Sequence, residues 1–193
     1  MEAQKNRCGQ LVDKIAEGDH AALGDLYELT KSQVYGLALA ILKNRSDAED
    51  VMQSTFIRVW DSAKSYRQGT DAGAWIMTIT RNLALDRFRR QKNMTDIMNL
   101  EDTLSGCDEI SPQFDRMLLN HLLSALDCSE RQIVMLHAMG GYSHKEIAHI
   151  VGRPYATVRW KYGNAVKKLQ AFLAKEDSYE NKEQIQLAKS NCK

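Results

Sequence analysis

Apolar side chains recur along most of this chain every three or four residues, the spacing that places them on one face of an α-helix. Over residues 10–44 the pattern is interrupted once, near Gly18, which predicts two helices there. Ser46 and Glu49 have the spacing of a capping box, in which each side chain bonds the other residue's backbone N–H. A third helix is therefore expected to begin at Ser46 and to run to about Ser62.

The middle of the chain has two segments in which this periodicity is lost. Residues 64–73 are polar and contain two glycines, so we expect a loop there, followed by a fourth helix over residues 74–91. Residues 93–114 are acidic and show little periodicity, which is typical of a flexible linker. The chain is therefore expected to be all-α, with two small helical domains, the first over residues 1–92.

Helical spacing returns after the linker and predicts the second domain over residues 115–174. A leucine-rich helix is expected over residues 118–126. Ser129, with Gln132 as its partner in a capping box, is expected to open the next helix. Residues 175–193 are mostly polar and are expected to form a C-terminal tail.

Residues 142–169 predict a helix-turn-helix. Ser143 and Glu146 form a capping box at the start of its first helix. Gly152 ends that helix where a positive φ is needed, and Pro154 can open the second helix because its missing N–H is not needed there. An ordinary helical hairpin with a solvated basic face is the alternative interpretation.

The charges of this segment distinguish the two interpretations. Between residues 147 and 175 every formal charge is positive: Arg153, Arg159, Lys161, Lys167, Lys168 and Lys175. A second helix with this charge suits the phosphates and the base edges of a DNA major groove. DNA binding is therefore the favoured function of the second domain.

Composition adds a second basic segment and excludes several function classes. The net charge of the 193 residues is only +1, yet residues 81–92 carry five basic side chains against one acid. No apolar run reaches the length of a membrane span, and the first residues do not resemble a signal peptide. We expect a cytoplasmic protein without membrane insertion. The four cysteines contain no C-x-x-C pair, so neither a metal site nor a disulfide framework is indicated, and no cofactor is expected.

The chain contains DAEDVMQSTF at residues 47–56 and AWIMTITRN at residues 74–82, followed by Asp86 and the pair Arg89-Arg90. These segments closely resemble bacterial RNA polymerase sigma factors of the extracytoplasmic-function (ECF) family. The helix-turn-helix lies where that family has its second DNA-binding domain. The resemblance covers nearly the whole chain before the polar tail, and two motifs in the same order are more specific than either alone.

The resemblance implies a detachable specificity subunit of RNA polymerase that has no catalytic residues of its own. Residues 1–92 would form sigma region 2, which binds the polymerase core and recognises and opens the minus-ten promoter element. Residues 115–174 would form sigma region 4, which binds the minus-thirty-five element as duplex. The implied partners are the clamp and flap of the polymerase core, promoter DNA as duplex and as separated strands, and an anti-sigma factor.

The resemblance places core binding on the third helix, at Asp47, Asp50, Gln53 and Arg58. The first three recur every third residue and share a broad polar face that can pair with arginines of a partner. Alternatively, the acids only complement the positive end of the helix dipole. Ser54 stands where the family often has an acid.

The resemblance places contacts to the minus-ten element on the loop and the fourth helix. The loop would offer a stacking ring and hydrogen-bonding edges to an unstacked base. Its expected contact residues are Tyr66, Arg67, Gln68, Thr70 and Asp71. The loop would be held against Trp75 and Asn82 of the fourth helix. Four arginines of the helix would follow the DNA backbone: Arg81, Arg87, Arg89 and Arg90. An ordinary solvent loop is the alternative. Asp86 is expected to pair with an arginine, and Trp60 and Trp75 are expected in the core.

The N-terminal end of the recognition helix is expected to enter the major groove at the minus-thirty-five element. Arg159 could bond a guanine edge, and three lysines could hold phosphates. The full set of expected contacts is Arg153, Tyr155, Ala156, Thr157, Arg159, Trp160, Lys161, Lys167 and Lys168. Ala156 and Trp160 depart from the usual residues of the family.

Three rival functions fit parts of the sequence. A helix-turn-helix repressor or activator would bind duplex DNA without polymerase. An enzyme could use Asp47, Glu49 and Asp50, or His137, His144 and His149, as metal ligands, but neither set has a typical ligand spacing. A decoy that binds polymerase without DNA is disfavoured because both basic segments are intact.

Overall fold

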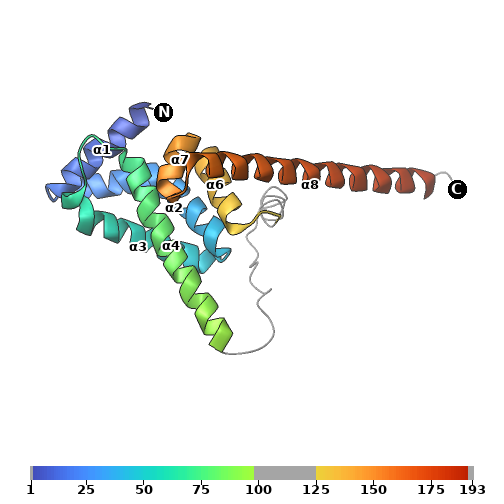
Figure 1. Ribbon diagram of the computed structural model, residues 1–193, viewed down its shortest axis with the longest axis horizontal. Helices are drawn as coiled ribbons and strands as arrows, with labels where there is room; N and C mark the ends of the chain where they lie inside the picture. Colours follow the sequence, from blue (N-terminus) through green and yellow to red (C-terminus); the bar gives the residue numbers. More distant parts are fainter. Residues whose placement is uncertain (1, 98–124, 191–193) are drawn as a thin grey trace.

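The computed structural model describes residues 2–97 and 125–190, with side chains over residues 6–92 and 125–174 (Figure 1). The helices are α1 (Glu2–Ala16), α2 (His20–Leu42), α3 (Arg45–Ser62), the short 3₁₀ helix η1 (Ala63–Ser65), α4 (Ala72–Ile97), α6 (Cys128–Ala138), α7 (His144–Val151) and α8 (Tyr155–Ser190). Neither described range contains a strand, and the all-α class is confirmed.

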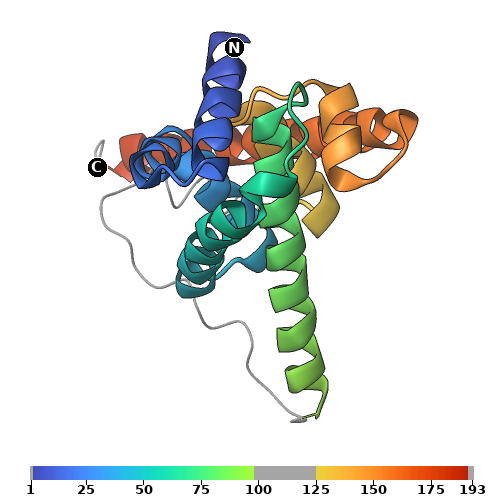
Figure 2. The same ribbon diagram turned by 90° about the vertical axis from the view of Figure 1, so that its left-hand side faces the viewer.

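Helix α2 is the centre of the first domain, and α1, α3 and α4 pack around it (Figure 2). Its inward face carries Leu26, Val34, Leu37 and Ile41, each at most 2% exposed. Complete burial of a side chain of this size stabilises a fold by about 1.5–3 kcal/mol. This apolar face therefore holds the first four helices together.

The predicted break near Gly18 is confirmed. Gly18 has a φ of 95°, which favours glycine, and Asp19 then caps α2 by accepting hydrogen bonds from the N–H groups of Ala21 and Ala22 at 2.9 and 3.2 Å. At the other end, Lys43 adopts a left-handed conformation with a φ of 56°. The two helices expected over residues 10–44 are therefore α1 and α2.

The expected capping box of Ser46 and Glu49 is wrong. Asn44 is the N-cap of α3, and its side-chain oxygen accepts a hydrogen bond from the N–H of Asp47 at 3.0 Å. Glu49 pairs with Arg45 at 2.9 Å on the helix surface. Asn44 is as good a cap as serine and comes earlier in the chain, so the helix begins one residue before Ser46.

The same shift occurs at α6, where the expected capping box of Ser129 and Gln132 is also wrong. Asp127 is the N-cap, and it exchanges hydrogen bonds with Glu130 at 2.8 and 2.9 Å. Ser129 donates to Asp127 from within the first turn. In contrast, the expected capping box of Ser143 and Glu146 is present at the start of α7.

Helices α4 and α8 both extend beyond their expected ends. Helix α4 runs to Ile97, so residues 93–97 are helical and do not belong to a linker. Helix α8 runs to Ser190 and includes most of the expected polar tail. Neither extension contains glycine or proline, so nothing breaks the helix after its apolar face ends. The rest of the predicted linker, and the predicted helix up to residue 124, lie outside the described residues.

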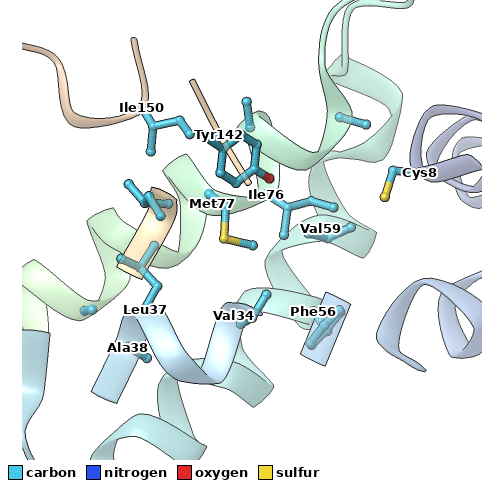
Figure 3. Packing of buried hydrophobic residues seen from close by; sticks show 14 of the residues in the cluster. Cys8, Val34, Leu37, Ala38, Phe56, Val59, Ile76, Met77, Tyr142 and Ile150 are labelled. Carbon is cyan, nitrogen blue, oxygen red and sulfur yellow. The ribbon is translucent and has the colours of Figure 1, made fainter. Parts of the chain in front are cut away.

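Helices α6 and α7 pack against α2 and α4, so the two groups of helices share one buried cluster. Figure 3 shows Tyr142 and Ile150 of the second group above Met77 and Ile76 of α4. Helix α8 projects away from this body along most of its length (Figure 1). The surfaces expected to bind DNA in the two domains are therefore close together in this structure.

Candidate nucleic-acid and polymerase interface

Three of the four side chains expected to bind the polymerase core lie on one exposed face of α3. These are Asp50, Gln53 and Arg58. Asp47 instead points toward α4 and is 8% exposed. Its carboxylate accepts hydrogen bonds from Arg87, at 2.6 and 3.0 Å, and from Gln91. Asp47 therefore fixes α4 against α3, and only its three neighbours are presented to a partner.

Ile57 is a member of this face that the sequence analysis missed. Its side chain is 64% exposed and lies four residues after Gln53, within the polar stripe of the helix. A large exposed apolar side chain surrounded by polar ones is typical of a protein interface. The sequence itself indicates that Ile57 is exposed, because this residue falls outside the apolar spacing of α3.

The loop before α4 is held by its own hydrogen bonds. The Tyr66 hydroxyl donates to the carbonyl of Thr70 at 2.5 Å, and the Thr70 hydroxyl donates to the carbonyl of Arg67 at 2.8 Å. The ring of Tyr66 lies 5.2 Å from that of Trp75. Arg67, Gln68 and Thr70 remain exposed, so this ordered loop presents polar edges beside an aromatic pair.

Asp71 has a structural role at the end of the loop. Its side chain is half-buried and accepts a hydrogen bond from the N–H of Ala74 at 3.0 Å, which caps the start of α4. The expected contact of Asp71 with a base would therefore compete with this cap. Trp75 is half-buried, and Trp60 is half-buried and stacks on His20 with ring centroids 4.3 Å apart.

The basic face of α4 is only partly available. Arg89 and Arg90 are exposed, as is Asn82, and Asp86 pairs with Arg89 at 3.3 Å as expected. Arg87 bonds Asp47 and also lies 3.4 Å from Asp50. Arg81 is half-buried and donates to the side-chain oxygen of Gln132 in α6 at 2.9 Å. Burial, followed by the nearby charge of Arg153, lowers the pKa of Arg81.

The helix-turn-helix forms as expected. Helix α7 is followed by Gly152 with a φ of 62°, and α8 begins at Tyr155. Val158 is fully buried between the helices, and Thr157 is half-buried. The outward positions at the start of α8 are exposed: Arg153, Tyr155, Ala156, Arg159 and Trp160. Trp160 is 65% exposed, an unusual position for tryptophan unless it contacts a partner.

Two of the lysines expected to hold phosphates are paired within the domain. Lys161 lies 3.2 Å from Asp127, and Lys168 lies 2.8 Å from Glu130, whose side chain is almost fully buried. Burial raises the pKa of Asp127, but hydrogen bonds from the Glu130 N–H, Ser129 and Lys161 outweigh it and bring the pKa to about 2. Of the three lysines, Lys167 alone is exposed and makes no salt bridge with the described side chains.

Three aromatic rings meet on the inner side of the helix-turn-helix. The rings of His137 and His144 stack with centroids 5.1 Å apart, and the ring of Tyr162 lies within 4.8 Å of both. Burial, followed by the charges of His137 and Arg159, lowers the pKa of His144. Over the described side chains, no group of three or more His, Cys, Asp or Glu residues is placed to hold a metal ion.

No helix in the described part of the chain is both long enough and apolar enough to cross a membrane.

Two family descriptions match the chain in order. Sigma-70 region 2 matches residues 26–94, and Sigma-70 region 4 matches residues 116–169. The first match covers α3, the loop and most of α4, and the second covers the helix-turn-helix.

Relatives match over most of the chain. It is 30% identical over 165 residues to the RNA polymerase sigma factor CarQ of Myxococcus xanthus, covering 84% of this chain and 95% of CarQ. It is 36% identical over 173 residues to the ECF RNA polymerase sigma factor SigE of Mycolicibacterium smegmatis, covering 84% of this chain and 67% of SigE.

Two solved structures share the fold. CnrH in complex with the cytosolic domain of CnrY has a TM-score of 0.67 at 24% identity, covering 87% of this chain and 97% of CnrH. The sigma factor RpoE in complex with the anti-sigma factor NepR, from Bartonella quintana, has a TM-score of 0.66 at 23% identity, covering 78% and 96%. From these matches and the two regions in order, the chain belongs to the ECF family of RNA polymerase sigma factors.

Proposed function

We propose that this chain is a dissociable, non-catalytic subunit that gives RNA polymerase core its promoter specificity. The observation that carries the proposal is the capped helix-turn-helix, whose second helix presents Tyr155, Arg159 and Trp160 to solvent, in a chain that also contains Sigma-70 region 2. A repressor needs only the helix-turn-helix and has no use for Sigma-70 region 2. The boundaries of the two domains, residues 1–92 and 115–174, remain predictions.

The exposed face of α3 is the proposed contact with the polymerase core. Asp50 and Gln53 supply hydrogen-bond acceptors, and Ile57 supplies apolar area between them and Arg58. A polar rim around an exposed aliphatic side chain has the composition of a typical protein interface. Asp47 supports this face through its bonds to α4 and does not itself reach the partner.

The loop and α4 are the proposed site for the minus-ten element. Arg67, Gln68 and Thr70 present polar edges beside the Tyr66 ring, which suits a base that has left the stack. Arg89 and Arg90 are exposed on the following helix and suit backbone phosphates.

The start of α8 is the proposed site for the minus-thirty-five element. Arg159 has the fork that bonds a guanine edge, and Trp160 offers an apolar surface to thymine methyl groups. Lys167 is the lysine best placed to contact a phosphate, because Lys161 and Lys168 are held by acids of α6.

We also propose an anti-sigma factor as a regulatory partner. The structures of CnrH with CnrY and of RpoE with NepR were each solved as a complex. The fold shared with these two proteins supports a similar partner for this chain, of unspecified identity.

Binding measurements separate this function from the repressor alternative. The fluorescently labelled chain is titrated with polymerase core, and separately with random-sequence duplex DNA in the absence of polymerase. We expect tight binding to core that the substitution Ile57→Ser weakens and the exposed-site control Lys64→Ser does not. Failure to bind core, together with tight binding of the duplex DNA alone, would refute the proposal in favour of a repressor or activator.

A further inference from the structure

We propose that Arg87 of α4 is a positioning residue for polymerase binding and not a contact to DNA. It holds two acids of α3, the buried Asp47 and the exposed Asp50, and thereby fixes Asp50 in the orientation that it presents to the polymerase core. This role rests on the proposed function, in which the exposed face of α3 binds the core. It removes Arg87 from the arginines that the sequence predicts along the DNA backbone.

The spacing of charged and polar side chains on α3 matches that on α4. The two helices pack against each other (Figure 2), and side-chain bonds join the start of α3 to the second half of α4. Asp47 and Asp50 are three residues apart on α3, and Arg87 and Gln91 are four apart on α4, so each pair lies on one face of its helix. Arg87 therefore faces both acids at once.

Asp47 is the fixed end of this group. It is 8% exposed, and one of its carboxylate oxygens accepts hydrogen bonds from Nε and Nη2 of Arg87 at 3.0 and 2.6 Å. Its other oxygen accepts a hydrogen bond from Gln91. Hydrogen bonds between ionised groups are among the strongest in proteins. The position of the Arg87 guanidinium is therefore set by a buried partner.

Asp50 is the end of the group that faces a partner. Nη2 of Arg87 lies 3.4 Å from Oδ2 of Asp50, whose side chain is 55% exposed. An exposed side chain without a neighbour samples several rotamers, and ordering it on binding costs free energy. Arg87 restricts Asp50 before the partner arrives, while the exposure of Asp50 keeps its carboxylate accessible.

The charges of this group favour a cationic partner over a phosphate. One arginine faces two carboxylates, so the three side chains together keep one net negative charge. Arg87 can therefore orient Asp50 without neutralising the surface. A phosphate that approached Arg87 would meet both carboxylates. If it drew Arg87 away from Asp47, it would leave a nearly buried carboxylate without its cation, which is strongly unfavourable.

Arg89 and Arg90 differ from Arg87 in this respect. The Arg89 side chain is 71% exposed, and the Asp86 side chain that it pairs with at 3.3 Å is 60% exposed. A surface pair of this kind contributes little stability, so it can be exchanged for a phosphate. Arg90 is exposed as well. The arginines of α4 therefore divide between the polymerase-binding face and the DNA-binding face.

The substitution Arg87→Lys tests the positioning role. It keeps the charge but loses the planar group that reaches both acids. The affinity for polymerase core is measured by fluorescence titration for Arg87→Lys, for Asp50→Asn and for the double variant. Arg45→Lys is the matched control, because it makes the same change in an exposed ion pair of α3, that of Arg45 with Glu49. Circular dichroism and urea unfolding check that each variant folds.

We expect Arg87→Lys to weaken core binding about fivefold, the scale of the cost of ordering one side chain on binding. In the Asp50→Asn background the same change should weaken core binding less than about twofold, because the carboxylate that Arg87 positions is no longer charged. Arg45→Lys should leave core binding unchanged.

The substitution Arg87→Gln tests the DNA role, because it removes the charge. Core is saturated with the chain, and the affinity of the complex for a fluorescent random-sequence single strand is measured at several salt concentrations. Each phosphate contact to a single strand contributes about 0.7 to the slope of log affinity against log salt concentration. Arg87→Gln should leave this slope unchanged, whereas Arg90→Gln should reduce it by about 0.7.

Two results would overturn this assignment. If Arg87→Lys changed core affinity by the same factor with and without Asp50→Asn, or did not change it at all, Arg87 would not act through Asp50. If Arg87→Gln reduced the salt slope as much as Arg90→Gln, Arg87 would be a phosphate contact. Failure of the proposed function gives a different result, because the wild-type chain itself would then not bind core.

Discussion

Two adjacent lysines on α8 provide a test of how the recognition helix divides its charges between folding and DNA. Lys168 lies 2.8 Å from both carboxylate oxygens of Glu130, whose side chain is 4% exposed. Lys167 is exposed and points to solvent. Although both were expected to hold phosphates, the structure predicts opposite consequences for the substitutions Lys168→Met and Lys167→Met.

The magnitudes follow from burial. Removing one partner of a fully buried pair costs about 3–5 kcal/mol, because the remaining charge is left without its partner. The Lys168 side chain is 48% exposed, so water compensates part of this loss and we expect Lys168→Met to lower the free energy of unfolding by about 1–2 kcal/mol. Lys167→Met should stay within about 0.5 kcal/mol of the wild type.

DNA binding should show the reverse order. Each phosphate contact contributes about 0.9 to the slope of log affinity against log salt concentration. Lys167→Met should reduce this slope by about 0.9, whereas Lys168→Met should leave it nearly unchanged. Urea unfolding and salt titrations with duplex DNA measure the two quantities. Equal destabilisation by both substitutions, or a slope change only with Lys168→Met, would refute this assignment.

Three further predictions concern single side chains. Ser143→Ala removes the cap of α7 and should lower the free energy of unfolding by about 1 kcal/mol in urea; no loss would mean that Glu146 alone holds the helix start. Because burial lowers the pKa of His144, its folded form binds fewer protons than the unfolded form, so stability should be full above about pH 6.5 and fall as the pH drops below it. The urea midpoint of His144→Asn should fall less between about pH 7.5 and 5.5 than that of the wild type. An equal fall in both proteins would mean that a group other than His144 causes the pH dependence. Trp160→Ala should weaken duplex binding without changing stability, because the side chain is 65% exposed; a lower unfolding midpoint would contradict this.

The helices of this chain were predictable where cap and apolar pattern agree. The start of α7 is an example, since Ser143 and Glu146 have capping-box spacing just before the apolar residues from Ile147, and no other Ser, Thr, Asp or Asn lies within four residues of Ser143. At α3 and α6, two good cap residues lie two positions apart, Asn44 with Ser46 and Asp127 with Ser129. A pattern of three to four residues per turn cannot choose between them. Which of the two residues becomes the N-cap depends on where the helix must begin in order to pack against the rest of the fold.

The roles of charged residues were less predictable than the helices. Asp47 and Arg87 are 40 positions apart, and Arg81 and Gln132 are 51 apart. Local sequence contains no information on such pairs, so it predicts Asp47, Arg81 and Arg87 at solvent-facing sites and Gln132 in a capping box. The same applies to the contact of Arg131 with Ala40, which crosses 91 positions. Tertiary packing alone reveals that these side chains already have partners.

Run-off transcription is the sharpest test of whether this chain gives RNA polymerase its promoter specificity. Purified polymerase core is supplied with a library of supercoiled promoter templates, with and without this chain. We expect initiation at defined start sites only when the chain is present, with a common sequence at both the minus-ten and the minus-thirty-five position. Core that binds the chain but starts no transcript on any template would contradict it.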